Sequence, residues 1–78
     1  MLHREHWIFM GGNSMWRYIT NKNLKQTEGS TVKEINGDKL YTVAKVGRNM
    51  ISIVNDFGFA QLISRQVFKD SYVVQEVE

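Results

Sequence analysis

The chain lacks cysteine and proline, contains no long apolar run and carries little net charge. The absence of cysteine excludes disulfides and thiolate metal sites, and it fits a protein of a reducing cytoplasm. No apolar run approaches the roughly 20 residues that a transmembrane helix needs, and the first residues lack the apolar stretch of a secretory signal. The formal charge is +2. Because the charges are spread along the chain, this excess does not by itself predict a nucleic-acid partner.

The rest of the composition is that of one small globular domain. The chain has 78 residues, and 42% of them are hydrophobic. That fraction is too high for a disordered segment, and the length is too short for two domains. A domain of this size buries a thin core, so we expect only marginal stability.

Residues 1–14 differ from the remainder of the chain. They show neither the period of a strand nor that of a helix, and they end in the flexible sequence Gly-Gly-Asn-Ser. The Gly-Gly pair can be encoded by a purine-rich sequence like a bacterial ribosome-binding site, a short spacer before the codon of Met15. Two interpretations follow: residues 1–14 are a translated leader, or they form a genuine N-terminal arm. The domain proper is expected over residues 15–78.

From Met15 onward, apolar and polar residues alternate with a period of two, which is typical of β-strands. The predicted strands are residues 15–20, 39–46, 50–54, 59–63 and 72–77. In the second of these, strict alternation places Tyr41 and Val43 on one face and Val46 on the other. For the core we expect the side chains of Ile51, Ile53, Tyr41 and Phe68.

The connections between the strands carry recognisable turn chemistry. Residues 21–34 are mostly polar and predict a long first loop, and Asn36-Gly37 is a strong turn signal. Tight turns are predicted at residues 47–49 and 55–58, with Gly58 at a positive φ. Residues 64–68 are predicted to form one 3-10 turn with Ser64 as its cap.

This order of elements predicts an all-β fold, an SH3-like five-stranded small barrel with a 3-10 turn before the last strand. Five short strands, a long first loop, two tight hairpins and a helical turn describe that architecture. The alternative is an OB-fold, another small barrel. It needs more residues and a helix between its third and fourth strands, and no segment here is suited to such a helix.

The segment from Gly37 to Tyr72 resembles a group of very short phage and prophage proteins of SH3-like type. The residues that carry the resemblance are Gly37-Asp38-Lys39-Leu40-Tyr41-Thr42-Val43, then Ile53-Val54-Asn55-Asp56-Phe57-Gly58, and later Phe68. They follow a pattern G-K-x-Y-x-V, N-D-x-G and a final F, with one residue inserted before Lys39. Such a resemblance implies a phage or prophage origin and a location in the cytoplasm of a bacterial host. Turn and core residues make up the pattern, so it says little about function.

Motifs of catalysis and metal binding are weak in this sequence. Asp56-Phe57-Gly58 spells the magnesium-binding triplet of protein kinases, but the other kinase motifs are absent, so a hairpin turn is the better interpretation. His3 and His6 could approach one metal ion only from a helix, and no third ligand accompanies them. Both histidines precede Met15, which leaves the domain without a Ser-His-Asp set. We therefore expect no enzyme, no metal site and no cofactor.

The candidate partner-binding residues lie in turns, where a rigid scaffold can present them. Arg48 and Phe57 occupy the two hairpin turns, and Arg65 and Lys69 flank the helical turn. An exposed ring at a hairpin tip is often a contact point, although Phe57 could instead fold back over Met50 or Val54. If the loops converge at one end of the barrel, these side chains form one partner surface.

The sequence predicts a small binding protein that acts on a host or phage protein. The alternative is a weak, electrostatic nucleic-acid-binding barrel, since basic and aromatic side chains also suit phosphate contact and base stacking. An accessory part of a virion or a larger complex is a further interpretation. A proline-rich peptide ligand is disfavoured because the first loop carries three lysines against two glutamates.

Overall fold

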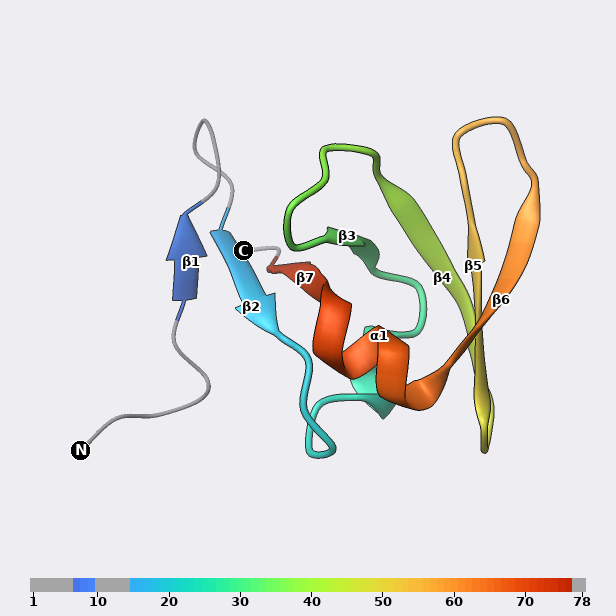
Figure 1. Ribbon diagram of the computed structural model, residues 1–78, viewed down its shortest axis with the longest axis horizontal. Helices are drawn as coiled ribbons and strands as arrows, with labels where there is room; N and C mark the ends of the chain where they lie inside the picture. Colours follow the sequence, from blue (N-terminus) through green and yellow to red (C-terminus); the bar gives the residue numbers. More distant parts are fainter. Residues whose placement is uncertain (1–6, 10–14, 77–78) are drawn as a thin grey trace.

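The structure of the chain is a computed structural model, which describes residues 7–9 and 15–76. In these residues seven strands form one antiparallel sheet, and a short helix precedes the last strand (Figure 1). The elements are β1 (Trp7–Phe9), β2 (Met15–Tyr18), the 3-10 helix η1 (Lys25–Thr27), β3 (Thr31–Glu34), β4 (Tyr41–Val46), β5 (Met50–Val54), β6 (Ala60–Ser64), α1 (Arg65–Ser71) and β7 (Tyr72–Glu76). The mostly β composition is the one predicted from the sequence.

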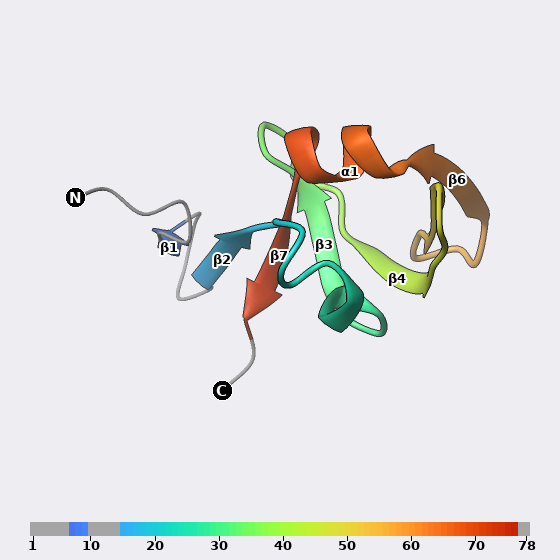
Figure 2. The ribbon, with the colours of Figure 1, turned by 90° about the horizontal axis from the view of Figure 1, so that it is seen from below.

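The strands follow the order β1-β2-β7-β3-β4-β5-β6 along the sheet. The C-terminal strand therefore lies between β2 and β3, as Figure 2 shows. β3, β4, β5 and β6 form a meander in which each strand pairs with the next. Within the described residues β1 and β6 end the sheet and do not pair with each other, so the sheet is not closed.

β3 and η1 occupy residues that were predicted to be loop. The polar segment 21–34 contains both elements, so the prediction of one long loop is wrong. Of the four residues of β3, Val32 alone is fully buried, and it lies opposite Val74 of β7. A sequence with one apolar residue in four lacks the alternation that marks a strand. β3 is a strand because pairing with β7 and β4 satisfies its backbone.

β1 lies within residues 1–14, the segment predicted to be a leader or an N-terminal arm. It pairs antiparallel with β2, with Ile8 opposite Trp16. Pairing of β1 with β2 fits the interpretation of this segment as an N-terminal arm. That the natural protein begins at Met15 stays a prediction. The Gly-Gly joint and both histidines lie outside the described residues.

A β-bulge in β4 changes which side chains reach the core. Val43 lies opposite Ile53 and Val46 lies opposite Ile51, so β4 has one residue more than β5 between these two pairs. The bulge leaves Ala44 unpaired and reverses the alternation beyond it. Val43 and Val46 are both buried, and the prediction that they face opposite sides is wrong.

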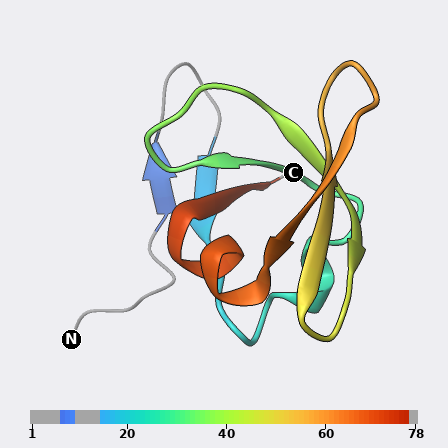
Figure 3. The ribbon, with the colours of Figure 1, turned by 45° about the vertical axis from the view of Figure 1, so that its right-hand side comes forward.

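The core lies between the curled sheet and α1 (Figure 3). Ile51, Ile53 and Phe68 are fully buried, as predicted. Tyr41 is partly buried and packs against the core, where its ring meets that of Tyr72 edge-on at 6.3 Å between centroids. The remaining core side chains are Ile19, Leu24, Val32, Val43, Val46 and Val74.

An α-helix of seven residues stands where a 3-10 turn was predicted. Ser64 is its N-cap as expected, and its Oγ accepts a hydrogen bond from the amide of Val67 at 3.1 Å. The helix continues because Phe68 is fully buried and its carbonyl accepts the amide of Tyr72. That bond spans four residues, as in an α-helix, so the 3-10 assignment is wrong.

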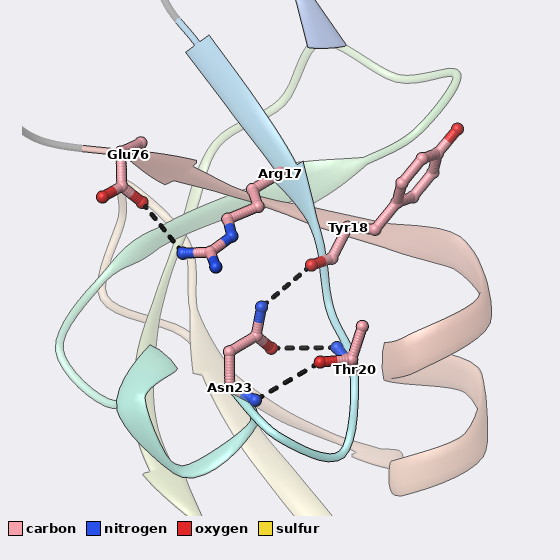
Figure 4. Close-up of polar contacts among 5 residues, drawn as sticks. All are labelled: Arg17, Tyr18, Thr20, Asn23 and Glu76. Atoms are coloured by element: carbon pink, nitrogen blue, oxygen red, sulfur yellow. Dashed lines mark hydrogen bonds and ion pairs between the residues drawn. The ribbon is translucent and has the colours of Figure 1, made fainter. Parts of the chain in front are cut away.

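The turn after β2 is held by side-chain hydrogen bonds (Figure 4). The Oδ1 of Asn23 accepts the amide of Thr20 at 2.9 Å, and its Nδ2 donates to the carbonyl of Tyr18 at 3.0 Å. Asn23 is buried, and these bonds satisfy its amide. On β2, Arg17 forms an ion pair with Glu76 of β7 at 3.7 Å. The bonds of Asn23 thus fix the turn after β2, and the ion pair joins β2 to β7.

Candidate partner-binding surfaces

The structure does not bring the four predicted partner residues together. Arg48, Arg65 and Lys69 lie at the end of the β5–β6 hairpin where Met50 faces Ser64. Phe57 lies in the turn at the opposite end, where Val54 faces Ala60. Figure 1 shows the two turns at opposite ends of these strands. The expectation that the loops converge is therefore wrong for Phe57 and right for the three basic residues.

Two hydrogen bonds hold the start of α1 against the β4–β5 turn. The amide of Arg65 donates to the carbonyl of Asn49 at 3.0 Å, and the Arg65 guanidinium donates to the carbonyl of Arg48 at 2.9 Å. Gly47 makes this turn possible, because a Cβ at that position would lie 2.8 Å from the carbonyl oxygen of Met50. The Arg65 side chain is thereby fixed against the backbone of the turn that carries Arg48.

These residues border a hollow that is basic in character. The hollow has a volume of about 270 Å³ and is lined by Asn21, Leu24, Lys25, Val46, Gly47, Arg48 and Arg65. We call it the basic hollow. Lys69 lies at its margin, since its ammonium donates to Oδ1 of Asn21 at 2.9 Å.

The electrostatics of the basic hollow favour an anionic partner. Among the described residues, Lys25, Arg48, Arg65 and Lys69 make no ion pair within 4.0 Å. The carboxylate of Glu28 lies beside the hollow, because it accepts the amide of the lining residue Val46 at 3.0 Å, but it forms no ion pair with these basic side chains. Three basic residues line the hollow, and a bound anion would reduce the repulsion between their charges.

The opposite end of the hairpin carries exposed apolar side chains. Phe57 is 83% exposed, Phe59 is 72% exposed and Leu62 is 66% exposed. The alternative in which Phe57 folds back over Met50 or Val54 is therefore wrong. Single exposed apolar side chains are normal on a protein surface, whereas a contiguous group of them marks an interaction site.

The turn that presents Phe57 is rigidly held. Oδ1 of Asn55 accepts the amides of Phe57 and Phe59 at 2.9 and 3.0 Å, and the amide of Asn55 donates to the carbonyl of Phe59 at 3.0 Å. Gly58 has a φ of +86°, as predicted, and its amide closes the turn on Asn55. This hairpin turn is also the structure of the Asp56-Phe57-Gly58 triplet.

A groove runs along the core-facing side of this turn. It has a volume of about 540 Å³ and is lined by Asp38, Lys39, Leu40, Tyr41, Asn55, Asp56, Phe57 and Gln61. We call it the tip groove. Leu40, Tyr41 and Phe57 are its apolar lining residues, and two carboxylates and a lysine are among the polar ones.

Sequence reasoning missed several residues of these two surfaces. Lys25 lines the basic hollow because η1 packs against β4, and no local sequence pattern predicts that contact. Leu40 was assigned to a strand, but it lies before β4 and lines the tip groove. Phe59 and Leu62 line neither surface, and their exposure had a signal in the sequence, because residues 59–64 contain no charge.

Comparison of the chain with protein-family models, with curated proteins and with solved structures returned no match. In the part of the chain that the structure describes, no helix is long and apolar enough to cross a membrane.

Proposed function

We propose that this chain is a small non-catalytic interaction domain that binds a protein partner through the tip groove. The exposure of Phe57 at the end of a protruding hairpin carries this proposal. A ring of this size supplies more apolar contact area than most side chains, and such anchors dominate protein interfaces. The neighbouring Asp38, Lys39 and Asp56 supply the polar rim that interfaces require.

The geometry of the turn supports the same proposal. Asn55 fixes the backbone on both sides of Phe57, so the ring is presented by a preorganised loop. A preorganised loop loses little conformational entropy on binding, and more of the contact energy appears as affinity.

We propose further that the domain is an SH3-like small barrel of phage or prophage origin that acts in the bacterial cytoplasm. The order β7-β3-β4-β5-β6, with a helical segment immediately before the last strand, supports the architecture. In this arrangement the first barrel strand is β3 and not residues 15–20, as the sequence had predicted, and β1 and β2 extend the sheet. The sequence pattern from Gly37 to Phe68 supports the origin.

The test of the tip groove is capture from a bacterial lysate. The full chain and the double variant Leu40→Ser/Phe57→Ser are immobilised and exposed to nuclease-treated lysate. We expect the parent to retain a specific protein and the double variant to lose it. The control is Val67→Ser, which alters a side chain that is 47% exposed on α1. Equal capture by the parent and the double variant would contradict the proposal.

A second candidate function is electrostatic binding of nucleic acid at the basic hollow. The gathering of Lys25, Arg48 and Arg65 around one hollow favours it. The probe is a labelled DNA duplex, measured by fluorescence anisotropy over a range of salt concentrations. Log affinity should fall with log salt at a slope of about −0.9 for each phosphate neutralised.

The variants for this second candidate separate the two surfaces. Arg48→Glu should abolish duplex binding, because it reverses one charge of the basic hollow. Lys39→Glu in the tip groove makes the same kind of change and should have a much smaller effect. Equal loss in both would indicate a response to net charge alone, and no binding by the parent would exclude this function.

A further inference from the structure

The outer edge of β6 is an open strand edge without the usual protection. In the described part of the chain no strand pairs with this edge, because β6 ends the sheet. Natural edge strands are blunted by lysine, proline or a bulge. Residues 59–64 contain no charged residue and no proline. The ladder between β5 and β6 runs without a bulge from Val54↔Ala60 to Met50↔Ser64.

The strand also stands clear of the body of the domain. Ala60, Gln61 and Leu62 are consecutive and all exposed, so both faces of β6 are in solvent here. A strand packed on a core would bury every second side chain. The exposed segment therefore offers its backbone and both faces to another strand.

The hairpin fixes which backbone groups point outward. Asn55 donates to the carbonyl of Phe59, so these two residues form a hydrogen-bonded pair. Hydrogen-bonded and non-hydrogen-bonded pairs alternate along an antiparallel ladder. The backbone groups of Gln61 and Ile63 consequently point toward β5. Those of Ala60, Leu62 and Ser64 point away from the sheet.

We propose that two copies of this chain pair antiparallel through their β6 edges, with a two-fold axis at Leu62. In this register Leu62 faces Leu62 of the second copy, and Ala60 faces Ser64 of the second copy. The backbone of Leu62 then pairs with Leu62 of the second copy, and the Ser64 amide pairs with the Ala60 carbonyl. The Ser64 carbonyl already accepts the first hydrogen bond of α1, for which Ser64 is the N-cap. The two Leu62 side chains, each 66% exposed in one copy, cover each other on the same face of the joined sheet.

The composition of the edge favours a second copy as the occupant. Self-pairing about a two-fold axis places the residue on the axis against its own copy, so a charge at that position would face a like charge. The segment 59–64 carries no charge, and this penalty is absent. Pairing of β6 with the other sheet edge, β1, would instead propagate without closing.

The dimer is independent of the proposed partner at the tip groove. Gln61 lines that groove on the core-facing side, whereas Leu62 projects from the opposite face of β6. A single strand pair buries less area than the roughly 1,600 Å² of a standard interface. We therefore expect a reversible dimer whose population rises with protein concentration.

The first test is sedimentation equilibrium of the full chain over a range of concentrations. The mass should rise from 9.1 kDa toward twice that value. Leu62→Lys places two ammonium groups beside the axis and should hold the protein at the monomer mass. Val67→Lys adds the same charge at an exposed site on α1 and should dimerise like the parent. Thermal melting of both variants verifies that they are folded.

The second test uses the absence of cysteine in the chain. Hydrogen-bonded residues in antiparallel strands lie about 5.5 Å apart between Cα atoms, which a disulfide can span. Leu62→Cys should therefore form a disulfide-linked dimer under mild oxidation, faster than Val67→Cys. The proposal is overturned by a parent that stays monomeric, by growth beyond the dimer, or by equal cross-linking of the two cysteine variants. A monomeric parent whose tip groove captures a protein would overturn the dimer and leave the proposed function intact.

Discussion

Val43 and Val46 lie three residues apart on one strand, yet both point into the core. In a regular strand, residues three apart face opposite sides of the sheet. The bulge at Ala44 adds one residue to β4, and this extra residue returns the Val46 side chain to the face on which Val43 lies. Val43 therefore lies opposite Ile53, and Val46 lies opposite Ile51, across the β4–β5 ladder. The bulge thus lets a six-residue strand contribute two valines to a thin core.

Deletion of Ala44 tests this account of the bulge. The shortened β4 should pair regularly with β5 and still direct Val43 and Val46 into the core. We expect its melting temperature to stay near that of the parent. Deletion of Ser52 from β5 is the control, because it forces Ile51 and Ile53 onto opposite faces and should unfold the domain. Unfolding of the Ala44 variant as well would show that the bulge itself is required.

Truncation of the core should be costly. Ile53→Ala and Phe68→Ala should each lower the free energy of unfolding by about 2–5 kcal/mol, because both side chains are fully buried and leave a cavity. Leu40→Ala, at a residue that is 42% exposed, should cost much less. Denaturant unfolding measures all three, and a core variant as stable as the parent would contradict the packing described.

Substitution of Gly58 should destabilise through the backbone alone. Its φ is +86°, and an added Cβ would meet no atom within 4 Å. Gly58→Val should therefore cost roughly 1 kcal/mol or more by strain, without a steric clash. Gly58→Asn is the matched variant, because asparagine tolerates positive φ better than other residues. The two should separate clearly in thermal melting, and equal stabilities would refute this explanation.

The stability of the domain should fall in strong alkali through Tyr72. Burial raises the pKa of its hydroxyl above the usual 10.0, and electrostatic repulsion from Glu34 and Tyr41 adds to the effect. The folded state then holds the proton more tightly than the unfolded state. The stabilisation is complete below pH 10 and is lost as pH rises through the folded pKa. Melting temperatures above pH 10 should fall less steeply in Tyr72→Phe, and parallel curves would contradict this role.

The sequence by itself determined the local features of this protein. Strong turn chemistry located the two hairpins, and the freedom of glycine placed Gly58 at a positive φ. Ser64 was identified as a helix cap because its hydroxyl can satisfy a free amide at the first turn. Alternation of apolar residues located β5 and assigned Ile51 and Ile53 to the core. Each of these inferences depends on interactions within a few residues of chain.

Only the tertiary structure decided the features that depend on distant pairings. β3 has a polar sequence and became a strand by pairing with β7, which lies some 40 residues further along the chain. The bulge at Ala44 follows from matching β4 to β5. The separation of Phe57 from Arg48 follows from the hairpin, because successive turns of a meander lie at opposite ends of the strands. The charge-free segment 59–64 was visible in the sequence, but its place at an open edge comes from the strand order alone, since no local interaction determines which strand ends a sheet.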